Sequence, residues 1–377
     1  MSSIFPTYAR WDVTVQKAEG AILIDTNEKE YLDFTSGIGV CNLGHNHPVV
    51  HQKVKEQLDQ VWHVSNLFHI PTQEQAAQML TDHSCGDYVF FCNSGAEGNE
   101  GAIKLARKYT GKWKIISFKQ SFHGRTFGSM SATGQEKIHE GYGPLLPQFE
   151  YALFNDIESV KSLIDDKVAA VMIEVIQGEG GVHPADPQFM AELQQLCIDH
   201  KLLLIVDEVQ TGIGRTGKAF AYEHYNLSPD IIVSAKGLGN GFPIGAVIGK
   251  EKLKEAFGPG SHGSTYGGNP LATAAACAVM SQVFQPEFLQ EVELKGNYFK
   301  ELLNEKLTSS NFVKEIKGKG LMIGIECDGE VGSLITKMRE KGFLALSAGP
   351  NVIRLLPPLT VTNEQLEQAA TVLAEVL

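Results

Sequence analysis

Two hydrophobic segments end in charged side chains that could do chemistry together. The run LLLIVDEVQ places Asp207 at the end of a strand-like stretch, and the run DIIVSAKG places Lys236 at the end of the next one. A buried carboxylate is costly without a charged partner, and a partly desolvated amine is a better nucleophile. Taken alone, Asp207 also fits a helix N-cap or a metal-binding carboxylate, and Lys236 also fits a surface lysine that begins a turn.

The pairing of these two residues favours a shared ligand. In open α/β sheets, ligands bind beyond the carboxyl ends of the strands, so neighbouring strands would deliver Asp207 and Lys236 to the same edge. An acid that keeps a pyridine nitrogen protonated, together with a nearby amine, is the pair of contacts that the ring of pyridoxal phosphate (PLP) requires. The sequence therefore predicts a PLP site at this edge of the sheet.

A phosphate group needs hydrogen-bond donors, and one segment offers them. FFCNSGAEGNEGAIKLARK predicts a strand, a turn of small residues and a helix that ends near Lys108. Ser94, Gly95 and Ala96 would present backbone N–H groups at the helix N-terminus, which attracts anions. Ser94 and Glu97 also match a capping box, so an ordinary capped turn fits equally. The P-loop pattern is missing, and no dinucleotide fingerprint follows the first strand, which disfavours a NAD-dependent dehydrogenase.

Further candidates follow other predicted strands. In SFHGRT, Phe122 could stack on a planar ring, and Arg125 could clamp a carboxylate or simply lie on a loop surface. In EVIQGEGG, Glu174 and Glu179 suggest acid–base work, although one of them could be structural. In NVIRLLPPL, Arg354 lies in an apolar stretch and needs a carboxylate from the protein or from a substrate.

Two polar motifs near the predicted domain boundaries complete the set. GSHGSTYGGNP contains Ser264 and Thr265, which are possible donors to a phosphate or a substrate. GHNHP and the following residues place His45, His47 and His51 close together in sequence. These histidines have no matching cluster of acids or cysteines, so we expect no metal site.

The elements that must position these residues alternate between strand and helix. Continuous apolar runs bounded by turns predict strands that are buried on both faces, at residues 89–93, 114–118, 169–175, 202–209 and 230–236. A helix is predicted over residues 187–200. This alternation predicts an α/β fold with a mainly parallel sheet.

The pattern of strand-like and helical segments along the chain predicts three structural regions. Residues 1–45 contain a predicted hairpin around Thr26 and Asn27 and would form the N-terminal part of a small domain. Residues 46–270 would form the large cofactor-binding domain. Residues 271–377 begin with a long helical stretch, continue with strand-like runs, and would complete the smaller α+β domain.

Composition narrows the function classes. The net charge of −12 makes nucleic acid or an anionic membrane a poor partner. The six cysteines include no C-x-x-C pair, which fits a reducing cytosol better than a disulfide framework. The segment MSSIFPTYAR has no apolar signal-peptide core, and no apolar run reaches membrane length, so we expect a cytoplasmic protein.

The motifs together resemble a known family. NSGAE, SFHGRT, IEVIQGEGG, IVDEVQTGIGRTG, SAKGLGNGFPIGA, STYGGNP and IRLLPPL follow one another along nearly the whole chain. In this order they resemble the class III PLP-dependent aminotransferases, which have PLP fold type I. The resemblance implies an aminotransferase in which Lys236 carries PLP as a Schiff base and then moves a proton. It also implies that Asp207 binds the ring nitrogen.

The resemblance assigns the remaining cofactor contacts to residues of these motifs. Gln210 would contact the ring hydroxyl, while Phe122 and Val209 would cover the two ring faces. Gly95 and Ala96, following Ser94, would bind the phosphate through backbone N–H groups.

Substrates and assembly are also implied by the resemblance. Arg125 would grip the α-carboxylate of N2-acetylornithine, and Arg354 would grip that of 2-oxoglutarate. Glu179 would mask Arg354 while the donor is bound, and Ser264 would contact the donor. Thr265 would reach the phosphate from a second subunit, which implies a homodimer with shared active sites.

Several alternatives remain open at this stage. Ornithine aminotransferases usually carry an aromatic residue where this chain has Ile38, but 4-aminobutyrate aminotransferases are aliphatic there. Succinyl-diaminopimelate is another possible donor. A non-catalytic PLP protein, a racemase or an aminomutase would keep Lys236 and Asp207 as well.

Gly98 and Gly101 stand where relatives usually have Ala, and each costs up to about 1 kcal/mol of helix stability. They suggest a loose helix near the phosphate-binding turn.

Overall fold

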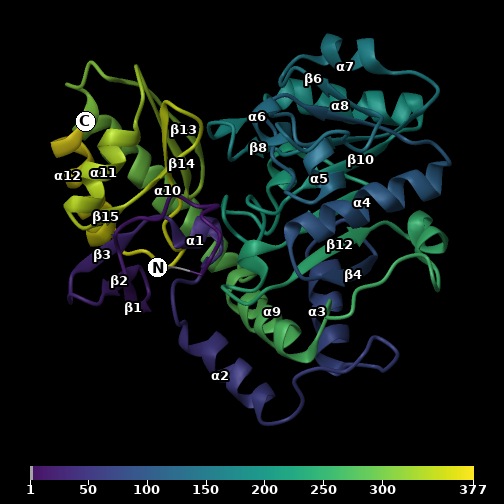
Figure 1. The fold of residues 1–377 in the computed structure, drawn as a ribbon, viewed down its shortest axis with the longest axis horizontal. Helices are drawn as coiled ribbons and strands as arrows, with labels where there is room; N and C mark the ends of the chain where they lie inside the picture. Colours follow the sequence, from purple (N-terminus) through teal and green to yellow (C-terminus); the bar gives the residue numbers. More distant parts are fainter. Residues whose placement is uncertain (1–2) are drawn as a thin grey trace.

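A seven-stranded sheet lies at the centre of the larger part of the computed structural model, which describes residues 3–377 (Figure 1). Its strands, in spatial order, are β4 (Tyr88–Cys92), β12 (Gly245–Gly249), β11 (Ile231–Ser234), β10 (Leu203–Asp207), β7 (Val168–Ile173), β5 (Lys114–Phe118) and β6 (Phe149–Ala152). Of these described strands, β12 runs antiparallel to both of its neighbours, and the pairs from β11 to β6 are parallel. The predicted α/β fold with a mainly parallel sheet is therefore confirmed.

Both faces of this sheet are buried, which explains the continuous apolar runs. Along β10, Leu203 and Ile205 belong to one hydrophobic cluster, while Leu204 and Val206 belong to another. Successive side chains of a strand point to opposite faces, so the two clusters lie on opposite sides of the sheet. Helix α4 (Gly95–Thr110) contributes to the first cluster, and α8 (Pro187–His200) and α9 (Pro270–Val283) contribute to the second.

Strand β12 was not predicted from the sequence. Its residues, GAVIG, follow the glycine-rich segment after Lys236 and lie in none of the predicted strands. In the structure, the segment turns back and inserts β12 between β11 and β4, with Val247 opposite both Val233 and Phe90. A short strand bounded by glycines carries little periodic signal, so its presence depends on the neighbouring strands that it pairs with.

The N-terminal strands join the C-terminal part of the chain. β2 (Ile22–Asp25) and β3 (Glu30–Asp33) form the predicted hairpin, and β1 (Val15–Glu19) pairs with β2. β15 (Phe343–Leu344) adds a parallel strand beside β3, so residues far apart in sequence share one four-stranded sheet. Figure 1 shows these purple and yellow segments together, on the side of the molecule away from α7 and α8.

A second four-stranded sheet belongs to the same smaller part. It contains β13 (Val313–Lys319), β14 (Met322–Cys327), β17 (Val352–Leu355) and β16 (Leu346–Ser347), all paired antiparallel. The helical stretch predicted after residue 270 is two helices, α9 and α10 (Pro286–Leu307). The boundaries of the large domain near residues 45 and 270 stay a prediction.

The remaining elements surround these sheets. A two-stranded ribbon of β8 (Ile176–Gln177) and β9 (His183–Pro184) follows β7. The other helices are α1 (Ser36–Gly39), α2 (Pro48–Leu58), α3 (Pro71–Asp82), α5 (Phe127–Ala132), α6 (Glu136–His139), α7 (Ile157–Leu163), α11 (Gly332–Glu340) and α12 (Asn363–Val376). Among the described residues, no helix is long and apolar enough to cross a membrane.

Helix α4 keeps its helical form at its two extra glycines, and the looseness expected there stays a prediction. The helix runs without interruption, and a Cβ built on Gly98 would lie 2.7 Å from Val233 Cγ1. At Gly101, the nearest atom to a new Cβ is Val247 Cγ2 at 3.1 Å. Gly98 therefore allows α4 to approach β11 closely, and Gly101 meets a milder constraint.

Substitution of these glycines should separate packing from helix propensity. We expect Gly98→Ala to lower the free energy of unfolding by about 1 kcal/mol or more, because overpacking outweighs the gain in propensity. Gly101→Ala is the matched control and should change stability less, in either direction. Urea denaturation of the two PLP-loaded variants measures the difference. A Gly98→Ala protein more stable than Gly101→Ala would contradict this account.

Candidate active site

A cavity of 390 Å³ opens where several strands of the large sheet end. Most residues that the sequence singled out line it: Ser94, Gly95, Ala96, Phe122, Arg125, Glu174, Glu179, Asp207, Val209, Gln210 and Lys236. They come from segments after β4, β5, β7, β10 and β11, which are separated by long stretches of sequence. The topology thus gathers them at one edge of the sheet, as parallel strands require.

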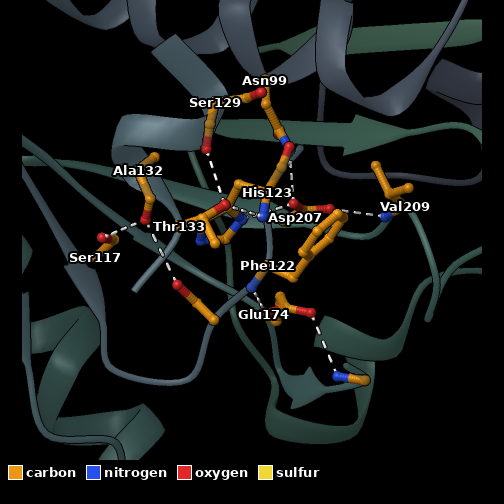
Figure 2. Close-up of polar contacts among 12 residues, drawn as sticks. Asn99, Ser117, Phe122, His123, Ser129, Ala132, Thr133, Glu174, Asp207 and Val209 are labelled. Carbon is orange, nitrogen blue, oxygen red and sulfur yellow. Dashed lines mark hydrogen bonds and ion pairs between the residues drawn. The ribbon is translucent and has the colours of Figure 1, made fainter. Parts of the chain in front are cut away.

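Asp207 sits at the centre of a buried hydrogen-bond network (Figure 2). His123 Nδ1 donates to Asp207 Oδ2 at 2.7 Å, and Asn99 Nδ2 donates to the same oxygen at 2.8 Å. The backbone N–H of Val209 donates to Oδ1 at 3.0 Å. These donors fix the carboxylate at the end of β10, so its orientation does not depend on a bound ligand.

His123 is an electrostatic partner of Asp207. Burial would lower the pKa of His123, but the hydrogen bond and the charge of Asp207, together with the charge of Glu174, outweigh it and raise this pKa. The backbone N–H of His123 donates to Thr133 Oγ1 at 2.9 Å, which holds the residue from its other side. His123 is therefore held against Asp207 by its hydrogen bond and by the charge of the carboxylate.

Lys236 follows β11 by two residues and begins a short 3-10 turn. Because β10 and β11 are adjacent and parallel, Asp207 and Lys236 leave the sheet at the same edge. Lys236 has a φ of 43°, in the left-handed region that a non-glycine residue rarely adopts. Such strain concentrates at functional sites. Burial lowers the pKa of the Lys236 amine, although the charge of Glu179 opposes this effect.

The turn after β4 forms one half of the capping box that the sequence suggested, because Glu97 bonds to Asn93 and not to the backbone N–H of the N-cap residue Ser94. Ser94 Oγ accepts a hydrogen bond from the backbone N–H of Glu97 at 3.2 Å, and Glu97 Oε2 accepts one from the backbone N–H of Asn93 at 2.7 Å. Gly95 and Ala96 line the cavity in the first turn of α4. A Cβ on Gly95 would lie 2.7 Å from Val209 Cγ1, so glycine is needed where these two segments meet.

Arg354 is buried on β17 and has a carboxylate partner from the protein. Its Nη1 donates to Glu179 Oε1 at 2.7 Å, and its Nη2 donates to Glu179 Oε2 at 3.1 Å. Gln210 Oε1 also accepts from Nη1, at 3.2 Å. Burial would raise the pKa of Glu179, but the charge and hydrogen bonds of Arg354 lower it. Glu179 lines the cavity but Arg354 itself does not, and the buried Nε of its guanidinium has no hydrogen-bond partner among the described residues.

Arg125 is in a different situation from Arg354. It lies on the exposed part of the loop after β5, with its guanidinium carbon 5.7 Å from the centre of the Phe122 ring. That distance is typical of a cation–π contact. Arg125 thus offers a guanidinium at the rim of the cavity, and Phe122 lies beside it.

Glu174 joins two of these loops from inside the protein. Its Oε2 accepts from the backbone N–H of Phe122 at 2.9 Å, and its Oε1 accepts from the backbone N–H of Gly178 at 3.3 Å (Figure 2). Burial raises the pKa of Glu174 to about 7, while the charge of His123 opposes the rise. The loop with Arg125 and the loop with Glu179 are therefore anchored to one side chain.

Ser264 and Thr265 lie outside the cavity formed by the described residues. Ser264 Oγ accepts from Asn93 Nδ2 at 3.2 Å and from the backbone N–H of Gly267 at 2.9 Å, so it supports the turn after β4. Thr265 is exposed. Elsewhere, His45 Nε2 pairs with Asp33 Oδ2 at 2.8 Å, which gives this histidine a structural partner.

Asn99 was missed by sequence reasoning. Besides its bond to Asp207, its Nδ2 donates to the backbone carbonyl of His123 at 2.6 Å, so it ties α4 to two cavity segments. The available signal was a polar side chain in the stripe of small residues Gly95, Gly98 and Ala102, which helical spacing places on one face. A buried amide in such a stripe needs specific partners.

Glu208, beside Asp207, does not line the cavity and has a structural role. Its Oε2 accepts from Thr211 Oγ1 at 2.5 Å, and its Oε1 accepts from the backbone N–H of Tyr222 at 2.7 Å. Burial raises the pKa of Glu208 from an ordinary 4.5 to about 7. The protonated form is thus favoured by folding, so its contribution to stability is complete below pH 4.5 and is lost as the pH rises through about 7.

This shift predicts a pH dependence of stability. Between pH 5 and pH 8, the wild-type protein should lose about 2 to 3 kcal/mol of unfolding free energy relative to Glu208→Gln, which cannot ionise. Denaturant titrations of both proteins at the two pH values measure the effect. Parallel pH profiles for the two proteins would show that Glu208 does not titrate in this range.

Comparison with known proteins places this geometry in a family. The sequence profile described as aminotransferase class-III matches residues 6–377. The chain belongs to the class III aminotransferases. It is 60% identical over 378 residues to the acetylornithine aminotransferase of Bacillus subtilis (strain 168), and the match covers 100% of this chain and 98% of that protein. The family resemblance of the motifs is thereby confirmed.

Solved structures of class III aminotransferases share the fold. The ornithine aminotransferase of Toxoplasma gondii ME49 matches with a TM-score of 0.95 at 32% identity, covering 99% of this chain and 92% of that one. The N-acetylornithine aminotransferase of Stenotrophomonas maltophilia K279a matches with a TM-score of 0.86 at 34% identity, covering 98% and 96%. The fold is that of PLP fold type I.

Class III aminotransferases depend on PLP, and the chain is such an enzyme. The side chains around the cavity fit this cofactor. Asp207 supplies a fixed carboxylate, Lys236 supplies an amine at the same edge, and Gly95 and Ala96 form a narrow first helical turn suited to a phosphate. His123 Nε2 and Asn99 Oδ1 are buried polar atoms with no partner among the described residues, as in a site built for a polar ligand.

Proposed function

We propose that this aminotransferase transfers the δ-amino group of N2-acetylornithine to 2-oxoglutarate. The products would be N-acetylglutamate 5-semialdehyde and glutamate, a step of arginine biosynthesis. The observation that carries the proposal is the 60% identity to the acetylornithine aminotransferase of Bacillus subtilis, which extends over the full chain. Arg125 at the cavity and Arg354, paired with the cavity residue Glu179, support it, because donor and acceptor each bring a carboxylate.

The arginines would divide the two substrates between them. Arg125, exposed at the rim, binds the α-carboxylate of the donor and leaves its distant amine to reach Lys236. Arg354, buried on β17, binds the α-carboxylate of 2-oxoglutarate. A guanidinium binds a carboxylate in a bidentate geometry, so each arginine fixes position as well as charge.

Glu179 would act as the gate between the two half-reactions. Its bidentate pair with Arg354 neutralises the guanidinium while the donor, which has a single carboxylate, occupies the cavity. For 2-oxoglutarate to bind, its carboxylate replaces Glu179 at Arg354. The lowered pKa of Glu179 keeps it ionised and able to return to the arginine.

Lys236 would carry the proton between the reacting carbon atoms. When bound, PLP supplies an electron sink that stabilises the negative charge left on the carbon after proton removal. Burial lowers the pKa of the Lys236 amine, which makes the neutral, proton-accepting form more available. Asp207, held by His123 and Asn99, would bind the cofactor's ring nitrogen and keep it protonated. Val209 and Phe122, which line the cavity, would cover the ring, and Gln210 would contact its hydroxyl.

A homodimer with shared active sites is part of the proposal. Thr265 is exposed and lies outside the cavity of its own chain, which supports its reaching the phosphate of a partner subunit. Large apolar side chains near it are exposed, with Leu67 at 92% and Tyr266 at 63%. Asn66 ties these segments together, donating to the carbonyls of Ser264 and Gly267 at 3.1 Å and 3.0 Å.

We also propose a cytoplasmic location and the domain boundaries near residues 45 and 270.

Ornithine is the second candidate donor, because solved ornithine aminotransferases share the fold. Ile38 lies near the cavity residue Val40, is 45% exposed and has a φ of 67°. Its aliphatic side chain argues against ornithine as the donor. It does not discriminate between N2-acetylornithine and 4-aminobutyrate. Ser264 stays a predicted donor contact for which the single chain shows only structural bonds.

The donor can be identified with the PLP-loaded enzyme. N2-acetylornithine, ornithine, 4-aminobutyrate and succinyl-diaminopimelate are added separately, and the change in the visible absorbance of bound PLP is followed without an acceptor. We expect N2-acetylornithine to give the largest second-order rate constant. A faster reaction with ornithine or 4-aminobutyrate would replace the proposed donor, and no reaction with any amine would refute the function.

A further inference from the structure

Glu100, on helix α4, makes contacts that the proposed reaction does not explain. Its Oε1 accepts a hydrogen bond from Thr126 Oγ1 at 2.5 Å and another from the backbone N–H of Ser129 at 2.9 Å. Thr126 follows Arg125 directly and is the N-cap residue of α5. Glu100 thus connects the helix of the phosphate-binding turn to the loop that carries the proposed donor clamp.

The cap of α5 is supplied from outside that helix. An N-cap threonine ordinarily accepts a hydrogen bond from a backbone N–H of the first turn, but the side chain of Thr126 accepts none. Glu100 accepts the bond from Ser129 instead, and the Thr126 hydroxyl donates to the same oxygen. A carboxylate makes stronger bonds to these donors than a hydroxyl would, so the loop is held firmly at the residue beside Arg125.

The site of the Glu100 carboxylate is shaped for it. A Cβ built on Gly128 would lie 2.2 Å from Glu100 Oε2, so a side chain at this position would displace the carboxylate. Thr126 Oγ1 and Ser129 Oγ lie 2.9 Å apart, which adds a further bond within the same turn. Glu100, Thr126, Gly128 and Ser129 therefore form one unit, which we call the Glu100 cap.

We propose that Glu100 is a positioning residue for Arg125, and that the Glu100 cap makes the enzyme select donors that carry an α-carboxylate. The inference rests on the proposed role of Arg125 as the donor clamp. Arg125 is exposed and has a long, flexible side chain, so its aim depends on the backbone that carries it. The acceptor clamp Arg354 lies on β17 with Glu179 and Gln210 as partners, outside the Glu100 cap. Loss of the cap should therefore weaken recognition of the donor carboxylate.

A matched pair of donors isolates the effect. N-acetylputrescine has the reactive amine and the acetamide of N2-acetylornithine but no carboxylate. The PLP-loaded wild type, Glu100→Gln, Thr126→Val and Arg125→Ala are compared in both half-reactions. Glu158→Gln, which removes an exposed carboxylate on α7, serves as the charge-matched control. Calorimetry with N2-acetylnorvaline, which lacks the reacting amine, measures carboxylate binding without turnover.

We expect Glu100→Gln to reduce the preference for N2-acetylornithine over N-acetylputrescine about tenfold, as the loss of one charge-assisted hydrogen bond would. Thr126→Val should act in the same direction, and binding of N2-acetylnorvaline should weaken in parallel. Glu158→Gln should match the wild type in every measurement.

The possible failures are distinguishable. If Arg125→Ala abolishes the donor preference but Glu100→Gln and Thr126→Val retain it, the inference is overturned and the proposed function stands. If Glu100→Gln slows both donors equally, Glu100 acts on the fold in general, which also overturns the inference. If Arg125→Ala keeps the full preference, the donor clamp itself is wrong and the inference falls with it.

Discussion

Replacement of Lys236 by alanine should reduce turnover by at least about 10,000-fold, the upper range for losing a positioned proton-transfer group. The expected loss is this large because one amine has two tasks, covalent attachment of PLP and movement of the proton. Its position at the end of β11, its strained backbone and its lowered pKa all suit these tasks. Steady-state assays with N2-acetylornithine and 2-oxoglutarate measure the loss.

Lys236→Arg is the matched control, because it keeps the positive charge but cannot form the covalent bond. Both variants should fail to retain PLP after borohydride treatment, whereas the wild type should yield a PLP-modified peptide that contains Lys236. Melting temperatures of the proteins show whether the fold is intact. Appreciable turnover by Lys236→Ala, or modification of another lysine in the wild type, would contradict the assignment.

Asp207→Asn should lower kcat by about 100- to 10,000-fold, the kinetic equivalent of 3 to 5 kcal/mol for breaking a buried charge pair. The amide has nearly the shape of the carboxylate but cannot hold a proton on the ring nitrogen of PLP. His123 and Asn99 would still surround the position, so the pocket should keep its form. Stopped-flow measurement of the donor half-reaction isolates the chemical step.

A second observable tests Asp207 without turnover. Because the bond and charge of Asp207 raise the pKa of His123 against burial, Asp207→Asn should lower the pKa of His123. Titration of the histidine resonance by NMR, in wild type and variant, measures the change. Asp207→Glu, which keeps the charge, should preserve more of the shift. Near-normal turnover in Asp207→Asn would exclude the proposed role in ring protonation, whatever the titration shows.

The sequence predicted those site residues that stand where an apolar strand ends in a polar side chain. The runs that end at Asp207 and Lys236 are apolar because both faces of their strands are buried, so the polar residue marks the edge of the sheet. Helix α8 has the predicted bounds, and β10 and β11 lie within the predicted segments, so the sheet edge was placed correctly. Short-range patterns of this kind need no knowledge of the tertiary fold.

Contacts between segments that are distant in sequence could not be predicted from such patterns. Glu100 and Asn99 lie on a helix whose pattern predicts only which face is buried, and their partners lie in the loop after β5 and at the end of β10. Strand β12 was not predicted, because its glycines are typical of a turn and its strand conformation depends on pairing with its neighbours. The Glu179 partner of Arg354 was implied by family resemblance, while the sequence alone required only some carboxylate.

The central claim is that Lys236 and Asp207 contact opposite ends of one bound PLP molecule. A crystal structure of the PLP-loaded enzyme tests it most directly. We predict continuous density from Lys236 Nζ into the cofactor and a separation of about 2.7 to 2.9 Å between an Asp207 carboxylate oxygen and the ring nitrogen. A cofactor bound without either contact, or with its ring nitrogen facing a residue other than Asp207, would contradict the account.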